Sequence, residues 1–178
     1  MFELLRKRRS IRKYSDRPVE KDKIDTLLKS VLLAPSSKGI RPWQFILVDD
    51  RETLQKLSQA KPHGASFVAN AAAAIVVIAD TEKSDVWVED AAIASVILLM
   101  MIEDLDLGGC WCQIRERTYD ANATASEYVK WALDIPENFE VESIIGFGYP
   151  AETKPGYEEN DLKYDTLHLN RFGTRYEV

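Results

Sequence analysis

Residues 85–107, DVWVEDAAIASVILLMMIEDLDL, decide the fold. The segment is long enough for about six turns of helix, and it is followed by Gly108-Gly109, a pair that ends helices. Its middle, from Ala91 to Ile102, is apolar except for Ser95. Because this stretch has no polar face, we expect burial on every side, either in the core or in a dimer interface. The apolar run has 12 residues; a membrane span needs about 20, so none is predicted.

Helix and strand patterns alternate on both sides of this segment. Residues 19–33 have apolar side chains at the spacing of an amphipathic helix, with Asp22 in the first turn. Shorter helices are predicted at 2–8, 51–60 and 125–133, and strands or extended segments at 43–48, 74–79, 110–114 and 141–147. About four short strands that alternate with helices favour one domain with a central sheet covered on both faces.

The charge of the chain is unevenly distributed. The 178 residues include 23 basic and 29 acidic side chains, for a net charge of −6. Residues 1–17 contain seven basic and two acidic side chains, a net of +5, which leaves −11 for the remainder. An acidic body repels nucleic acid, so we expect no nucleic-acid partner and predict that anion binding is concentrated at the N-terminus.

Several common classes of site are excluded. The sequence has no GxxxxGK[ST] phosphate loop. The GxGxxA pattern at 146–151 cannot open a dinucleotide-binding helix, because Pro150 and Pro155 interrupt that helix. Two histidines with Cys110 and Cys112 are too few for a metal site, and the two cysteines cannot form a disulfide framework. Since MFELLRKRRS also lacks the apolar stretch of a secretory signal, we expect a reducing, cytoplasmic location.

The segment Arg8-Arg9-Ser10-Ile11-Arg12 is the first candidate for a binding site. Guanidinium groups bind phosphate through paired, charge-assisted hydrogen bonds. In an extended segment, Ser10 and Arg12 point to one face, and Arg9 and Ile11 point to the other. One face could then hold an anionic ligand while Ile11 packs inward. The alternative interpretation is a solvated basic patch.

Two further segments have the composition of a binding surface. APSSKGIRPWQF at 34–45 combines two hydroxyls, backbone amides at Lys38 and Gly39, and Trp43, which suits a flat aromatic ligand. LGGCWCQIRER at 107–117 offers consecutive backbone N–H groups beside a large ring. The alternatives are an ordinary helix-to-strand turn with Trp43 in the core, and a strand that enters the core.

Four blocks in order resemble the nitroreductase family of flavin mononucleotide (FMN) enzymes: RRSIRKY at 8–14, APSSKGIRPWQF at 34–45, GCWCQIRER at 109–117 and IIGFGYPAE at 144–152. The resemblance extends from Phe2 to Tyr149 and continues more weakly to Phe172. It implies an α+β fold, a three-layer α/β/α sandwich with a central, mostly antiparallel sheet of four to five strands. It also implies that residues 1–178 form a single FMN-binding domain in an intertwined homodimer, whose C-terminal arm, about 150–178, packs on the partner subunit.

The resemblance also assigns residues to two FMN sites at the dimer interface. It implies that the phosphate, ribityl chain and pyrimidine edge contact Arg8, Arg9, Ser10 and Arg12. The flavin ring is then lined by Pro35, Ser36, Ser37 and Gly39 from the partner subunit. Backbone amides near Cys112, Gln113 and Ile114 face N5 and the C4 carbonyl. Lys154 and Lys163 are both candidates for the basic group that the tail supplies to the phosphate.

Two positions depart from the family pattern. The family often has Asn where this chain has Gly39, which affects the tuning of N5, and Gln where it has Arg41. An additional cation at position 41 favours an anionic substrate. No side chain is expected to act as a nucleophile, and no metal is expected.

The activity implied is that of an FMN-dependent NAD(P)H oxidoreductase. NADH or NADPH reduces the flavin and leaves, and a flat electrophilic acceptor such as a nitroaromatic or a quinone then takes its place, which gives ping-pong kinetics. The alternative, motivated by Gly39, is a flavin-binding dimer without turnover that acts as a sensor or carrier.

Overall fold

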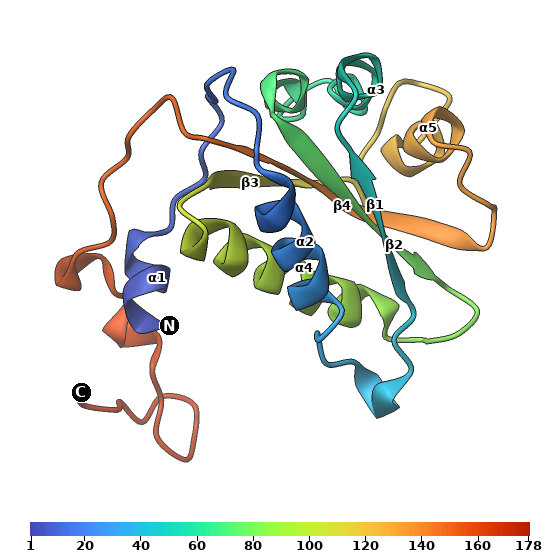
Figure 1. The fold of residues 1–178 in the computed structure, drawn as a ribbon. Helices are drawn as coiled ribbons and strands as arrows, with labels where there is room; N and C mark the ends of the chain where they lie inside the picture. The colour runs from blue at the N-terminus through green and yellow to red at the C-terminus, as the bar shows by residue number, and fades with distance from the viewer.

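The computed structural model describes all residues from 1 to 178 and has a central sheet between two layers of helices (Figure 1). The four strands are antiparallel in the order β1-β2-β4-β3, and they are β1 (Trp43–Val48), β2 (Ala73–Asp80), β3 (Gly108–Gln113) and β4 (Phe139–Gly148). One face is covered by α2 (Lys21–Val31) and α4 (Trp87–Asp104), the other by α3 (Arg51–Leu57) and α5 (Ala125–Ala132). The predicted three-layer α+β sandwich is confirmed.

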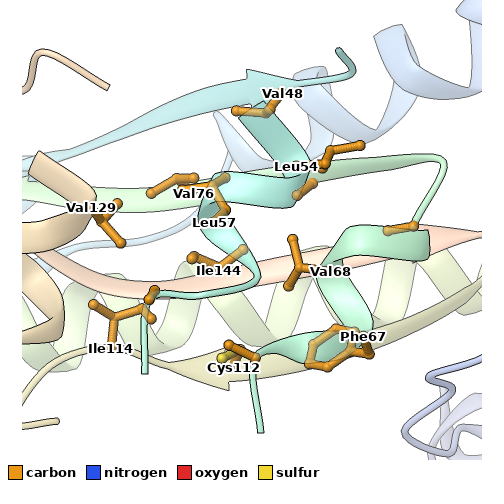
Figure 2. Packing of buried hydrophobic residues seen from close by; sticks show 14 of the residues in the cluster. Val48, Leu54, Leu57, Phe67, Val68, Val76, Cys112, Ile114, Val129 and Ile144 are labelled. Carbon is orange, nitrogen blue, oxygen red and sulfur yellow. The ribbon is translucent and has the colours of Figure 1, made fainter. Parts of the chain in front are cut away.

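The two central strands supply both cores because their side chains alternate across the sheet. Every residue of β2 is buried. Val76 and Ile144 point toward α3 and α5, where they pack with Leu54 and Val129 (Figure 2). Ile75 and its neighbours on the other face belong to the core under α2 and α4. This continuous apolar run explains why a strand between residues 74 and 79 was predictable.

Smaller elements complete the chain and refine the predicted boundaries. Helix α1 spans Phe2–Lys7, and short 3-10 turns lie at Ser37–Gly39, Ser66–Asn70, Glu159–Asp161 and Tyr164–Thr166. The turn at 66–70 was not predicted, because it is too short to show a helical spacing of apolar residues. It nevertheless buries Phe67 and Val68. Helix α5 begins at a capping box in which the Thr124 hydroxyl accepts from the Glu127 amide.

Helix α4 is not buried on every side within its own chain. The prediction that the core of the chain alone buries this helix is therefore wrong. Ala91, Leu98 and Ile102 pack inward. The opposite face leaves Ile93 and Val96 exposed, at 43% and 53% of their surface. An exposed apolar stripe therefore runs along the helix; it consists of Ala92, Ile93, Val96 and the half-buried Leu99. The dimer-interface alternative remains a prediction.

The two ends of the chain lie together, to one side of the sheet (Figure 1). The Tyr157 amide donates to the Arg6 carbonyl at 2.8 Å, which joins the C-terminal segment to α1. Beyond that point the tail is largely exposed, and Phe172 exposes 93% of its surface. No helix in the structure combines the length and the apolar character needed to cross a membrane.

Candidate functional site

The basic N-terminal segment has the predicted extended geometry. After α1, residue Ser10 forms a parallel bridge with Gly109, and the Ile11 amide donates to the Gly109 carbonyl at 3.1 Å. Ile11 is buried. Arg8, Ser10 and Arg12 line one cleft, whereas Arg9 and Ile11 line another. The alternation expected from residues 8–12 is therefore present.

The segment approaches the sheet closely because residue 108 has no side chain. A Cβ atom added to Gly108 would lie 2.8 Å from Cγ2 and 2.9 Å from Cβ of Ile11. The Cβ of Ile11 cannot move without its backbone, so this contact leaves no room for any other residue at position 108. The contact fixes how far Ser10 and Arg12 lie from β3.

The Gly108→Ala variant should lose stability, by about 1–3 kcal/mol for an overpacked contact, and it should also displace the N-terminal segment. We expect both a lower midpoint of thermal unfolding and weaker binding of any ligand held by Arg12. Gly146→Ala is the matched control, because its Cβ would meet the Phe67 ring at 3.0 Å on the same face of the sheet but would not contact Ile11. Equal losses of ligand affinity in the two variants would contradict this role for Gly108.

The start of the C-terminal segment holds the backbone of residues 10–13. Oε1 of Glu152 accepts from the Arg12 amide at 2.6 Å and the Lys13 amide at 3.3 Å. The hydrogen bond from the Arg12 amide lowers the pKa of Glu152, so its carboxylate is charged at neutral pH. Lys154 Nζ donates to the Ser10 carbonyl at 2.5 Å. Lys154 thus lies beside the basic segment, whereas Lys163 is exposed in the tail.

Arg8 and Arg12 face a cleft of about 440 Å³. Its other lining residues come from the N-terminal segment, α4, β3 and β4, and they are Ser10, Ala92, Ser95, Val96, Leu99, Trp111 and Glu142. Neither guanidinium forms an ion pair or a hydrogen bond within the chain; Arg12 contacts Glu152 only through its backbone. Two free cations beside a hydroxyl and a half-exposed indole ring make the cleft suitable for an anionic aromatic ligand.

A buried polar network forms the floor of this cleft. Oε2 of Glu142 accepts from Ser95 Oγ at 3.1 Å and from Trp111 Nε1 at 3.5 Å. Ser95 Oγ also lies 3.2 Å from Ser143 Oγ. Glu142 is the extra residue of a β-bulge, because Ser143 pairs with Val77 and Val141 pairs with Ile78. The bulge turns both Glu142 and Ser143 toward α4.

Sequence reasoning missed these residues, although two signals pointed to them. Ser95 is the only polar residue in the apolar run of α4, and Glu142-Ser143 interrupts an otherwise apolar strand. Buried polar groups need partners, so two such interruptions in elements that pack together indicate contact between them. The sequence alone does not show that Ser95 and Glu142 line the same cleft as Arg8 and Arg12, called here the Arg12 cleft.

Cys112, Gln113 and Ile114 lie at the end of β3, with two of their three side chains in the core (Figure 2). Cys112 and Ile114 are buried, and burial raises the pKa of the Cys112 thiol. The Ile114 amide donates to the Glu142 carbonyl at 3.0 Å, and the Gln113 carbonyl accepts from Lys61 Nζ at 2.9 Å. Both groups therefore already have partners within the chain.

The loop with Pro35, Ser36, Ser37 and Gly39 lies at the other end of α4. The Ser37 amide donates to Oδ1 of the buried Asp90 at 2.7 Å. None of these four residues lines the Arg12 cleft. Trp43, which follows the loop, is buried in the core as the alternative interpretation proposed. Within one chain, these four residues are therefore separate from the predicted site residues Arg8, Ser10 and Arg12.

Arg9 has a different environment from Arg8 and Arg12. Its guanidinium donates to the Pro155 carbonyl and lies 4.8 Å from the centre of the Tyr157 ring. It lines a second cleft of about 310 Å³ with Lys7 and Lys154. Arg9 therefore binds the C-terminal segment in this chain.

Known proteins share both the sequence and the fold. The sequence model of the Nitroreductase family matches residues 5–62. An archaeal protein from Archaeoglobus fulgidus, named "Putative NADH dehydrogenase/NAD(P)H nitroreductase", is 39% identical over 93% of this chain and 94% of its own. The chain belongs to the nitroreductase family. An FMN-dependent nitroreductase from Clostridium difficile has the same fold, with 51% identity, a TM-score of 0.95, and coverage of 97% of this chain and 100% of its own.

Another nitroreductase-family relative is an FMN reductase [NAD(P)H] from Bacillus subtilis, which is 31% identical over 92% of this chain and 72% of its own. The relatives are named as NAD(P)H-linked reductases. This chain is thus an oxidoreductase of the nitroreductase family, and its N-terminal match includes the Arg8–Arg12 segment.

Proposed function

We propose that this protein is an FMN-dependent oxidoreductase that takes electrons from NADH or NADPH and passes them to a nitroaromatic, quinone or similar flat electrophile. The observation that carries the proposal is the pair of free guanidinium groups, Arg8 and Arg12, in a cleft with an aromatic wall. The names of the C. difficile and B. subtilis relatives, which include FMN, support the same cofactor.

The residues of the cleft fit FMN in charge and in shape. Arg8 and Arg12 exceed the single carboxylate of Glu142, so the cleft has a net positive charge for a phosphate or an electron-rich ring edge. The half-exposed Trp111 ring and the side chains of Val96 and Leu99 offer apolar surface to an aromatic ring. A volume of about 440 Å³ lies within the range of cofactor pockets.

Each residue then has a distinct task. Arg8 binds the phosphate, Ser10 binds the ribityl chain, and Arg12 binds the pyrimidine edge. Lys154 supports them from the second cleft, where its Nζ holds the Ser10 carbonyl. When bound, FMN supplies the chemistry of accepting a hydride and passing electrons on. A cation such as Arg12 at the pyrimidine edge stabilises the negative charge that reduction places there. No side chain is required as a nucleophile.

We further propose that the site is completed in a homodimer. The exposed stripe on α4 is apolar in a chain with a net charge of −6, and such a surface marks a contact site. A two-fold axis across the stripe packs two α4 helices in antiparallel orientation. The N-terminal end of one helix, with the loop at 35–39, then lies next to the Arg8–Arg12 segment of the other subunit. This arrangement brings the site residues of the 35–39 loop next to those of the Arg8–Arg12 segment.

The C-terminal arm, about 150–178, is the second proposed dimer contact. It exposes Leu167, Leu169 and Phe172, which are close together in the sequence, and a cluster of exposed apolar side chains marks a contact site. Strand β1 is at the edge of the sheet, next to an apolar cleft lined by Leu28, Leu32, Trp43, Gln44 and Phe45. Trp43 Nε1 is buried there without an acceptor. The arm of the partner supplies apolar side chains and a backbone carbonyl for this edge.

The test is spectroscopic. The protein is mixed with FMN and desalted, and its absorbance spectrum is recorded before and after anaerobic addition of NADH or NADPH. Retained FMN that is bleached by either nucleotide, with parallel lines in double-reciprocal plots for a quinone or nitroaromatic acceptor, is the expected result. Failure of both nucleotides to bleach bound FMN would overturn the proposed activity.

A second candidate function is a flavin-binding dimer without turnover. It is favoured by Gly39, where the loop has no side chain and the position of a Cβ has no atom within 4 Å. Bleaching by a nucleotide followed by no reoxidation across quinones and nitroaromatics would support this candidate.

We place the protein in the cytoplasm, because both cysteines are free thiols in the core.

A further inference from the structure

We propose that the loop at 36–41 selects acceptors that carry a carboxylate or sulfonate group, which it binds through Lys38 and Arg41. The inference rests on the proposed function, since the partner subunit must bring this loop to the FMN cleft. It adds a substrate class to that function and assigns roles to two residues that the FMN site does not use.

Lys38 and Arg41 are both available to a ligand. Each is exposed, and neither side chain forms an ion pair, a hydrogen bond or a cation–π contact within the chain. Although the sequence has 29 acidic side chains against 23 basic ones, no carboxylate of the chain neutralises Lys38 or Arg41, in contrast to Lys21, which pairs with Asp25 at 2.6 Å. The loop therefore presents two unpaired positive charges within four residues.

The conformation of the loop is fixed within the chain itself. Lys38, Gly39 and Arg41 all have left-handed backbone conformations, with φ values of 52°, 69° and 54°. For residues other than glycine this conformation is strained, and it persists only where the surroundings enforce it. Ser36 Oγ accepts from the Arg41 amide at 2.8 Å, which closes the loop on itself.

The loop is also anchored to the body of the chain. The Ser37 amide donates to Asp90 Oδ1, and Asp90 is 2% exposed. The other carboxylate oxygen of Asp90 lies 3.4 Å from Ser84 Oγ. A loop fixed in this way holds its side chains in position before a ligand arrives, which lowers the entropic cost of binding.

Gly39 leaves open space between the two cations. A Cβ at this position would have no atom within 4 Å, so a flat ligand can approach the backbone directly. An anionic substituent on that ligand then lies near Lys38, the residue before Gly39, and Arg41, two residues after it. The net charge of −6 repels such a ligand at long range, so these local cations decide the preference.

The experiment compares two acceptors that differ in one charge, 4-nitrobenzoate and 4-nitrobenzamide. The measured quantity is the ratio of their kcat/KM values in wild type, Lys38→Gln, Arg41→Gln and the double variant. A contact between unit charges at 4 Å in water contributes about 1 kcal/mol, or about fivefold. We expect the ratio to fall about fivefold in each single variant and further in the double variant; because the two cations share one anionic partner, their separate losses do not simply multiply. High salt should also lower the wild-type ratio.

Lys29→Gln is the matched control, because Lys29 is an exposed cation on α2 outside the loop. It should leave the ratio unchanged. The nucleotide donor also carries an anionic diphosphate, and ping-pong kinetics separate the two substrates because kcat/KM for each is independent of the other. A loss confined to kcat/KM for NADH or NADPH, with an unchanged ratio for the acceptors, would overturn the proposal and assign the cations to the donor.

Equilibrium binding gives a readout that does not require turnover. Benzoate and benzamide are titrated calorimetrically into the FMN-loaded protein and its variants. Tighter binding of benzoate that is lost in Arg41→Gln supports the proposal, and equal binding of the two ligands in the wild type contradicts it. If the wild type binds benzoate selectively but reduces no acceptor, the proposed activity fails while the anion site stands.

Discussion

Replacing Arg12 with alanine should weaken FMN binding about 10- to 100-fold. Arg12 lines the cleft, and its guanidinium has no partner within the chain, so its whole hydrogen-bonding capacity is available to the ligand. Hydrogen bonds to charged groups contribute about 1.5–3 kcal/mol each, which corresponds to that range of affinity. The backbone of residue 12 is held by Glu152, so loss of the side chain leaves the segment in place. Fluorescence titration with FMN measures the change.

Lys13→Ala provides the control for this measurement. Lys13 is the next residue, and it is exposed, free of side-chain partners and held by the same Glu152 carboxylate through its amide. It carries the same charge but does not line the cleft. Equal losses of affinity in Arg12→Ala and Lys13→Ala would mean that FMN responds only to the net charge of the N-terminus.

A lysine at position 96 should separate the subunits and release FMN. Val96 is at the middle of the exposed stripe on α4, with 53% of its surface uncovered in the single chain. In the proposed dimer the two copies of residue 96 lie near the symmetry axis, so each lysine is desolvated and faces its own copy. A penalty of several kcal/mol raises the dimer dissociation constant by at least about 100-fold. Sedimentation velocity and retained flavin absorbance report the two effects.

Trp131→Lys tests whether any charge on an exposed apolar residue has the same effect. Trp131 is 72% exposed at the end of α5, which covers the opposite face of the sheet from α4. This variant should remain dimeric and retain FMN. A Val96→Lys protein that sediments as a dimer with bound FMN would place the interface elsewhere.

Local sequence patterns predicted most of the secondary structure. The amphipathic spacing before residue 33 and the apolar run of β2 are local signals, so α2 and β2 were found with small errors in their ends. The alternation at 8–12 was also predictable, because the period of an extended chain is fixed by its backbone. The four blocks of family resemblance likewise identified the nitroreductase fold, since the order of motifs along a chain is a property of its sequence.

Long-range contacts decided the rest. The cleft combines Ser10, Ser95, Trp111 and Glu142 from four separate parts of the chain. Local periodicity gives no information on which of these elements pack together. The contact of Gly108 with Ile11 and the bulge at Glu142 likewise depend on how strands and segments meet.

The sequence by itself determined the α+β class, the clustering of cations at the N-terminus and the family, because composition, periodicity and motif order are properties of the chain alone. The tertiary structure decided that Arg8 and Arg12 share a cleft with Glu142. It also decided that the loop at 36–41 lies apart from that cleft, anchored to Asp90 near the start of α4. It also left one face of α4 uncovered. The physical reason is that a site formed between distant elements depends on which surfaces the fold buries and which it leaves exposed.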